Sequence, residues 1–399
     1  MSAQPANSIP TDVVCLDDYA AYARQRLDDN ALAYLDGTAA DGLTADWNRQ
    51  AYARWALLPR VLQSLAGGHC RTELFGRELP SPILLAPIAW QKLFHPDGEL
   101  ATAYTAGALG VGMVLSTLAS VSIEAAAQAN QQGCAQGAGG PRWFQFYQQA
   151  EPSLNEELIR RAEAAGYEAI VFTVDAPING IRNREQRAGF TLPPGIEAVN
   201  LRHPLNPQDA EGYARRARSL AEKRRQRGPS AIFDDYMACA PTWADLDWLL
   251  ATTRLPVIVK GLLHPDDATQ AVRQGAAGVI VSNHGGRTLD TLPASLDCLP
   301  AIAEALHGQV PILLDGGIRR GSDIFKAIAL GASAVLIGRP YIHALAVAGP
   351  LGIAHLLRIL QDELEATMAL CGVACLAEIG PRHLKAQPVY PLYSQGVFR

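Results

Sequence analysis

The chain has 399 residues, of which 49% are hydrophobic and 18% are charged, and its formal net charge is −5 at pH 7. So large an apolar fraction excludes disorder as the dominant state, and the slight acidic excess argues against a broad nucleic-acid-binding surface. Seven scattered cysteines predict neither a disulfide framework nor a metal site. Residues 1–29 lack the basic start and apolar run of a secretory signal, so we expect a cytoplasmic protein.

The first elements along the chain are helical. Apolar residues recur with helical spacing over 16–27 and 29–35, so residues 1–60 predict a helical N-terminal extension. Farther along, residues 100–123 carry no formal charge and are long enough to cross a bilayer. Their serines, threonines and glycines instead predict a small-residue helix, a turn and a short buried strand. No membrane contact is expected.

One unit recurs from residue 82 onward: a short apolar β-prone run, a polar or glycine-containing loop, and an amphipathic helix such as 154–165 or 266–274. Continuous apolar runs are typical of strands that are buried on both faces of a parallel sheet. Eight such units predict an α/β fold, the (β/α)₈ TIM barrel. The alternative doubly wound sheet lacks a Gly-x-Gly-x-x-Gly motif after an early strand. The predicted strands are 82–89, 112–117, 143–147, 169–175, 256–261, 278–283, 310–316 and 334–338.

One long connection, residues 190–241, separates the fourth and fifth predicted strands. It begins with a Pro-rich stretch and contains a basic helix at 215–227, which we expect to be a solvated helix face. An insertion of this length after a barrel strand is usually a lid or a mobile segment. We therefore predict a single domain over 1–399, with 1–60 as an extension and 190–241 as a lid-like insertion.

Polar side chains fall at the C-terminal ends of six predicted strands. A closed parallel barrel brings these ends together at one mouth, where active sites of such barrels lie. A polar residue at one strand end is common, whereas polar residues at six strand ends predict an active site. The residues are Gln145, Tyr147, Thr173, Asp175, Lys260, Ser282, Asn283, His284, Asp315, Gly338 and Arg339.

The most informative motif is Ser-Asn-His-Gly-Gly-Arg at 282–287. His284 can take up a proton near neutral pH, and Arg287 can bind a carboxylate with two parallel hydrogen bonds. Asp175 can orient His284, although an Asp after a strand is also a common helix cap. Lys260 inside a barrel needs an anionic partner or acts as a Schiff-base amine, unless its amine reaches solvent at the rim.

Two Gly/Arg motifs indicate a phosphate site. Asp-Gly-Gly-Ile-Arg-Arg-Gly at 315–321 follows the seventh predicted strand, and Gly-Arg-Pro at 338–340 follows the eighth. Barrels frequently bind phosphate with the loops after these two strands, through backbone N–H groups. Arg319 and Arg339 would supply the fixed positive charge.

Together these motifs resemble the FMN-dependent α-hydroxy-acid oxidases, the family of glycolate oxidase, lactate oxidase and mandelate-oxidising enzymes. The resemblance extends from about residue 15 to 385. It also rests on the sequences at 86–89, 95–99, 144–147, 173–175 and 259–261.

The resemblance implies that FMN is the cofactor and that an L-2-hydroxy acid is oxidised to the 2-oxo acid, with O₂ reoxidising the flavin to give H₂O₂. It implies that His284 is the base, paired with Asp175. Tyr147 would bind the substrate hydroxyl, and Lys260 would stabilise negative charge on the reduced flavin. The implied cofactor-binding residues are Ile88, Ala89, Ser116, Gln145, Thr173, Lys260, Ser282, Asp315, Gly317, Arg319, Gly338 and Arg339.

The same resemblance implies a carboxylate site made of Tyr34, Arg182 and Arg287. A gap in the alignment would replace Tyr34 by Ala33, and Arg184 is an alternative to Arg182. Both alternatives stay open at this stage.

Leu118 stands where glycolate oxidase has a tryptophan, which implies room for a larger 2-substituent, from lactate-like to mandelate-like. The expected partners are a small 2-hydroxy acid and O₂, in a homotetramer by resemblance. Other readings are a dehydrogenase that reduces a quinone, a non-flavin phosphate-binding isomerase or lyase, and a barrel that only binds ligand. The polar composition of 200–230 disfavours docking on a membrane.

Overall fold

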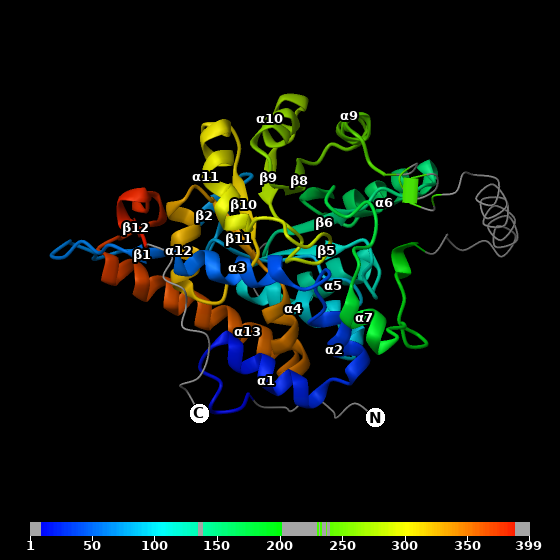
Figure 1. Cartoon of the computed structure of the whole chain (residues 1–399), viewed down its shortest axis with the longest axis horizontal. Helices are drawn as coiled ribbons and strands as arrows, with labels where there is room; N and C mark the ends of the chain where they lie inside the picture. The colour runs from blue at the N-terminus through cyan, green and yellow to red at the C-terminus, as the bar shows by residue number, and fades with distance from the viewer. Residues whose placement is uncertain are drawn as a thin grey trace, which may run out of the picture.

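The computed structural model describes residues 9–134, 139–201 and 240–387, together with residues 230, 232, 233 and 237. Within them, parallel strands close a barrel that runs from β4 to β11 in chain order, with helices on its outside (Figure 1). The predicted (β/α)₈ barrel and its eight strands are confirmed. The barrel strands are β4 (Ile83–Leu85), β5 (Gly112–Ser116), β6 (Arg142–Phe146), β7 (Ala169–Thr173), β8 (Val257–Leu262), β9 (Gly278–Val281), β10 (Ile312–Asp315) and β11 (Ala334–Ile337).

Apolar side chains fill the inside of the barrel. Because successive strand residues point to opposite faces, one alternate set from each strand packs inward. Trp143 is the largest of these side chains, and its ring meets Phe75 edge to face at 5.5 Å. Phe75 lies in the turn between β2 (Thr72–Leu74) and β3 (Arg77–Leu79), so this hairpin covers one end of the barrel core. The site therefore lies at the opposite, C-terminal end of the strands.

The helices follow the strands as the apolar spacing predicts. The region 100–123 divides into α4, a turn and β5, as expected. The helices are α1 (Leu16–Arg26), α2 (Asp29–Leu35), α3 (Leu43–Ala53), α4 (Glu99–Leu109), α5 (Ile123–Gly133), α6 (Pro152–Ala164), α7 (Asn183–Ala188), α9 (Trp243–Thr252), α10 (Pro265–Gln274), α11 (Ser295–Leu306), α12 (Gly321–Ala329) and α13 (Arg339–Cys371).

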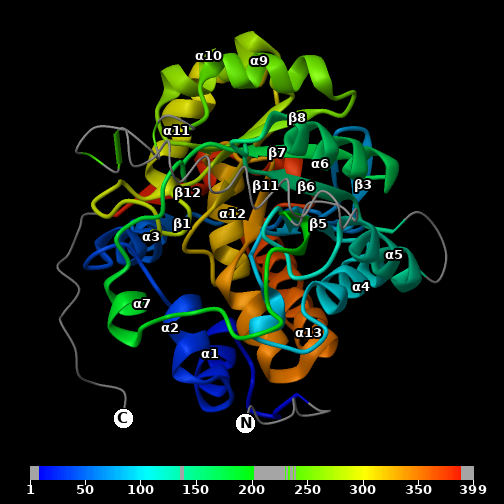
Figure 2. The same cartoon turned by 90° about the vertical axis from the view of Figure 1, so that its right-hand side faces the viewer.

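The long helix α13 is apolar enough, by length and composition, to cross a membrane. It is nevertheless interrupted by non-helical backbone at Ala348 and Gly349, and 67% of its most apolar stretch is buried in the protein. The first helix, α1, packs along it (Figures 1 and 2). This burial is typical of a core helix of a globular fold.

The N-terminal extension is helical, as predicted, and it brings chain to the mouth of the barrel. Asp28 caps α2, since its side chain accepts a hydrogen bond from the backbone N–H of Ala31. The helix ends at Leu35, and it packs beside α7 of the loop that follows β7 (Figure 2). Farther on, β1 (Trp55–Leu57) pairs antiparallel with β12 (Leu384–Ala386), which ties the extension to the end of the described chain.

Most of the insertion 190–241, including the predicted basic helix at 215–227, lies outside the described residues. Its beginning is held at one buried residue. Asn200 is fully buried, and its side chain accepts from the N–H of Ile123 and donates to the carbonyl of Val121, both at 3.0 Å. The start of the insertion is therefore anchored to the N-terminus of α5.

The crossing of α4 and α5 gives a test of the fold. A Cβ at Gly107 would lie 2.0 Å from the carbonyl oxygen of Asn130, so Gly107→Ala must push the two helices apart. We expect it to lower the free energy of unfolding by about 1–3 kcal/mol, measured by urea denaturation. Gly380→Ala is the control, because a Cβ at Gly380 meets nothing within 4 Å. Equal stability of the two variants would contradict this packing.

Candidate active site

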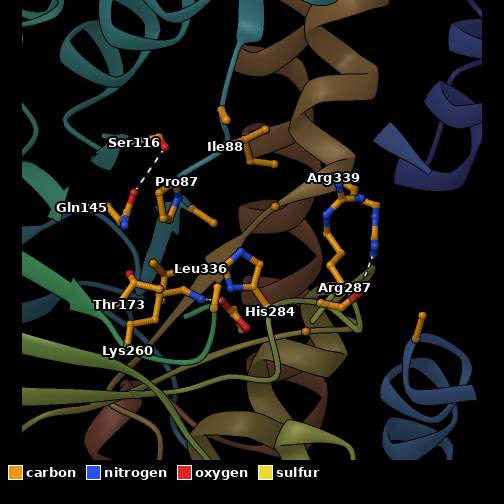
Figure 3. Close-up of a pocket in the computed structure, with 18 of the residues that line it drawn as sticks. Pro87, Ile88, Ser116, Gln145, Thr173, Lys260, His284, Arg287, Leu336 and Arg339 are labelled. Carbon is orange, nitrogen blue, oxygen red and sulfur yellow. Dashed lines mark hydrogen bonds and ion pairs between the residues drawn. The ribbon is translucent and has the colours of Figure 1, made fainter. Parts of the chain in front are cut away.

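A cavity of about 450 Å³ opens at the C-terminal ends of the barrel strands (Figure 3). The predicted site residues line it except Asp175, Ser282 and Asn283. Asp175 and Ser282 lie behind His284 and Lys260. Asn283 is fully buried against Asn48. The residues that do line it are Tyr34, Ile88, Ala89, Ser116, Leu118, Gln145, Tyr147, Thr173, Arg182, Lys260, His284, Arg287, Asp315, Gly317, Arg319, Gly338 and Arg339.

His284 is presented to the cavity by an unusual turn. Its φ is +57°, and Gly285 and Gly286 follow with φ of +62° and +74°. A left-handed conformation strains a non-glycine residue, and such residues persist only where surrounding contacts hold them. Here the backbone N–H of His284 donates to Ser282 Oγ at 3.0 Å, and that of Gly286 donates to Asn283 Oδ1 at 3.2 Å. The turn is therefore held by buried polar side chains.

Asp175 determines which imidazole nitrogen carries the proton. Its carboxylate lies 2.9 Å from His284 Nδ1. Burial opposes ionisation of Asp175, but His284 and Lys260 together hold the pKa of this carboxyl below its ordinary value. An ionised carboxylate only accepts hydrogen bonds, so the Nδ1–H of His284 donates to it and leaves a lone pair on Nε2. That nitrogen lies 3.3 Å from the hydroxyl of Tyr147, whose pKa is raised by burial.

The strand assignments of two predicted residues were wrong. Asp175 lies two residues beyond the end of β7 at Thr173, and Lys260 does not end β8, which continues to Leu262 past a bulge. The bulge contains Gly261 with φ +108°, where a Cβ would lie 2.4 Å from the Cβ of Asp175. Only glycine lets Asp175 approach Lys260 so closely, and periodicity alone does not reveal this irregularity.

Lys260 is a buried cation with anionic neighbours. Its Nζ lies 3.1 Å from Asp315 Oδ2 and donates to Ser282 Oγ at 2.8 Å. Burial alone would lower the pKa of the amine, but Asp315 and Asp175 raise it above its ordinary value. Lys260 is therefore a fixed positive charge in the cavity wall, which excludes both a solvated amine at the rim and a neutral amine nucleophile.

Five polar atoms of residues that line the cavity lack a partner within the described chain, and three of these atoms belong to barrel strands. The three are Gln145 Nε2, Thr173 Oγ1 and Asp315 Oδ1, all shielded from solvent. The other end of the Gln145 amide is fixed, since Oε1 accepts from Ser116 Oγ and the N–H of Thr117 at 3.3 and 3.1 Å. Figure 3 shows Gln145, Thr173 and Lys260 together on one side of the cavity. Buried polar groups are normally hydrogen-bonded, so these atoms indicate a ligand with both acceptors and donors.

The opposite side of the cavity holds a buried cation, Arg339. Arg339 is buried and donates only to backbone carbonyls, with no carboxylate within 4 Å among the described residues. Burial, followed by the charges of Arg287 and Arg319, lowers the pKa of Arg339 to about 9. A buried guanidinium destabilised in this way favours a bound anion. The accepting carbonyls belong to Leu35, Gly37 and Gly285.

A second group of basic side chains lies beside Tyr34. The guanidinium of Arg287 lies 4.8 Å from the Tyr34 ring and donates to the carbonyl of Tyr34 at 2.8 Å. Glu185 accepts from Arg287 at 3.1 Å and from Arg182 at 3.3 Å, and so holds both guanidinium groups in place. Glu185 was not predicted from the sequence. Its position three residues after Arg182 was the available signal.

Of each of the two alternative pairs, one residue lines the cavity and the other does not. Tyr34 lines the cavity, whereas Ala33 is buried in the core beside it. Arg182 lines the cavity, whereas the side chain of Arg184 is 52% exposed and lies 3.9 Å from Asp36. No group of three or more His, Cys, Asp or Glu residues in the described chain could hold a metal ion.

Comparison with known proteins agrees with this geometry. The sequence profile of the FMN-dependent dehydrogenase family matches residues 23–386. An L-lactate oxidase of Roseobacter sp. (strain GAI101) is 48% identical over 368 residues, covering 92% of this chain and 94% of the relative. Glycolate oxidase 1 of Zea mays is 40% identical, covering 92% and 94%. A crystal structure of mandelate oxidase with benzoyl-formic acid superposes with a TM-score of 0.80 at 38% identity, covering 94% and 98%.

The unpaired charge of Arg339 predicts anion-dependent stability. We expect inorganic phosphate to raise the melting temperature of the ligand-free protein, because a ligand that binds only the folded state stabilises it by about 1.4 kcal/mol at ten times its Kd. The increase should be lost in Arg339→Met and kept in Arg320→Met, whose guanidinium is half-exposed and paired with Glu363. Sodium chloride of equal ionic strength controls for screening. An undiminished increase in Arg339→Met would refute the anion site.

Proposed function

The chain belongs to the FMN-dependent dehydrogenase family, within which its relatives are 2-hydroxy-acid oxidases, and we propose that it oxidises L-2-hydroxy acids of lactate to mandelate size. The products would be the 2-oxo acid and, with O₂ as the electron acceptor, hydrogen peroxide. The observation that carries the proposal is the imidazole of His284, held by Asp175 at 2.9 Å and placed in the cavity wall between the cation of Lys260 and that of Arg287.

FMN fits the groups that the cavity leaves without partners. The unpaired atoms of Gln145 and Thr173 suit the polar edge of the flavin ring, and the guanidinium of Arg339 suits its phosphate. When bound, FMN would supply the acceptor for the two electrons of the substrate together with its α-hydrogen. Lys260 would stabilise negative charge beside the ring. We propose that the cofactor is held by Ile88, Ala89, Ser116, Gln145, Thr173, Lys260, Asp315, Gly317, Arg319, Gly338 and Arg339, with Ser282 holding Lys260.

We assign the substrate carboxylate to Arg287, Arg182 and Tyr34. Glu185 and backbone carbonyls fix the two guanidinium groups from behind, so little side-chain freedom is lost when a carboxylate binds. The Tyr34 ring is packed against Phe190 at 5.1 Å and Trp90 at 5.3 Å, which sets the direction of its hydroxyl. These contacts orient the acid relative to His284.

His284 Nε2 then takes up the proton of the substrate hydroxyl. Because Asp175 accepts from Nδ1–H, Nε2 is the basic nitrogen and the imidazolium that forms is stabilised by an adjacent carboxylate. Burial keeps Tyr147 protonated, so its phenol can donate a hydrogen bond to the substrate oxygen while His284 acts on it.

Leu118 supports substrates larger than glycolate. It lines the cavity, and a leucine occupies less space than the tryptophan that glycolate oxidase has in this loop. Each substrate methylene that is buried against an apolar wall contributes about 0.8 kcal/mol when the fit is good. The 48% identity to an L-lactate oxidase and the structural likeness to mandelate oxidase support the same range of acids.

A panel of L-2-hydroxy acids tests the proposal directly. In air, the holoenzyme should produce the 2-oxo acid and hydrogen peroxide in equal amounts from glycolate, lactate, 2-hydroxyoctanoate or mandelate. Flavin reduction without peroxide, together with turnover when a soluble quinone is added, would favour the dehydrogenase alternative. Failure of every L-acid in the panel to reduce the flavin under argon would refute the proposal.

Replacement of the base gives a second test. We expect His284→Gln to retain FMN but to slow flavin reduction by L-lactate about 10²–10⁴-fold, the range typical for loss of a general base. Anaerobic stopped-flow absorbance measures this rate. His69→Gln, at an exposed histidine outside the cavity, serves as the control. A wild-type rate in His284→Gln would rule out the assignment of this residue as the base.

A further inference from the structure

Trp90 holds a backbone conformation that tryptophan rarely adopts. Its φ is +51° and its ψ is +49°, in the left-handed region, where a bulky residue is strained. Its N–H donates to the carbonyl of Leu118 at 3.1 Å, and the N–H of Gln91 donates to the buried carboxylate of Glu99 at 2.9 Å. These bonds fix the turn on both sides. Glycine would adopt this conformation without strain, yet the chain has a tryptophan here.

The indole of Trp90 is a second unfavourable feature of this residue, because its N–H is unpaired among the described residues. Its Nε1 is shielded from solvent and has no hydrogen-bond partner within the described chain. A buried N–H normally has an acceptor. Among the described residues this N–H has none, so the contacts they make with the indole are packing contacts. A strained backbone and an unpaired N–H at one residue point to a use for the bulk of the ring. Replacement of the indole by another ring would therefore remove no hydrogen bond.

The position of the ring suggests what that use is. Trp90 and Leu118 both line the cavity, and the Trp90 ring lies 5.3 Å from the ring of Tyr34. Tyr34 in turn lies over the guanidinium of Arg287. The indole therefore borders the end of the cavity to which we assign the substrate carboxylate. The 2-substituent branches from the carbon that carries this carboxylate, so it projects into space bounded by the same walls.

We propose that Trp90 sets the upper size limit of the substrate's 2-substituent. Leu118 leaves room for a substituent larger than the hydrogen of glycolate, and the indole of Trp90 closes that room beyond a short alkyl group. This inference rests on the proposed function and narrows it: lactate is preferred to mandelate. The indole of Trp90 thereby limits the size of the pocket, as the tryptophan in the loop equivalent to that of Leu118 does in glycolate oxidase.

Two variants and one control test this role. Trp90→Gly removes the ring and also relieves the left-handed strain, so it should keep the fold, and Trp90→Phe keeps an aromatic ring of smaller area. Phe94→Leu removes a neighbouring buried ring, 6.3 Å from Tyr34, that does not line the cavity. The measurements are kcat/KM for L-lactate and (S)-mandelate, and the Kd values of pyruvate and benzoylformate from changes in flavin absorbance. FMN content and melting temperature verify the fold.

In the wild type, lactate should have the higher kcat/KM. Trp90→Gly should raise the ratio of mandelate to lactate kcat/KM about tenfold or more, with a parallel change in the Kd ratio of benzoylformate to pyruvate. Trp90→Phe should shift both ratios less, and Phe94→Leu should leave them unchanged.

Three results would overturn the role of Trp90: a wild type that prefers mandelate, unchanged ratios in FMN-loaded Trp90→Gly, or an equal shift in Phe94→Leu. Failure of the proposed function looks different, because no acid would then reduce the flavin in any variant. The Kd ratio of benzoylformate to pyruvate would still report on Trp90 in that case.

Discussion

The site depends on buried groups of opposite charge that lie beside one another at the C-terminal ends of neighbouring strands. The carboxylate of Asp175 lies between His284 and Lys260, and the ammonium of Lys260 lies between Asp175 and Asp315. Each charge is desolvated, so each is tolerated only because its neighbour has the opposite sign. These four residues lie at or near the C-terminal ends of β7 to β10, which are adjacent and parallel, so the strands bring them together at one end of the barrel. The groups proposed for proton transfer and for charge stabilisation near the flavin therefore form one electrostatic unit.

The same cavity carries positive charge that the carboxylates of the described residues do not fully neutralise. Arg339 meets only backbone carbonyls, whereas Glu185 is the carboxylate shared by Arg182 and Arg287. Proteins commonly give up stability at binding sites in this manner. Here the surplus lies where two anionic groups are proposed to bind, the phosphate of the cofactor and the carboxylate of the substrate. The surplus positive charge thus lowers the stability of the fold without ligands and raises its affinity for both ligands.

Much of this arrangement is readable in the sequence because apolar runs and their polar ends obey simple rules. Continuous apolar segments predicted all eight barrel strands, and the polar residues at their C-terminal ends predicted one part of the cavity wall. The part of the wall that α3 supplies, at Ala45, Asn48 and Arg49, was not predicted. The bulge at Gly261, the strained turn at Trp90 and the position of Ser282 behind Lys260 were not predicted. They depend on contacts between residues distant in the sequence, which local spacing does not encode. The link from Glu185 to Arg287, about a hundred residues apart, is another such contact.

Asp175 is proposed to make His284 a base by fixing its tautomer and stabilising the imidazolium. The most direct measurement is the anaerobic rate of flavin reduction by L-lactate in Asp175→Asn, with FMN content and melting temperature verified against the wild type. The side-chain amide of the Asp175→Asn variant is neutral, so we expect the rate to fall by about 10²-fold or more while FMN remains bound. A rate equal to that of the wild type would show that the charge of Asp175 has no part in the reaction and that Asp175 does not make His284 a base.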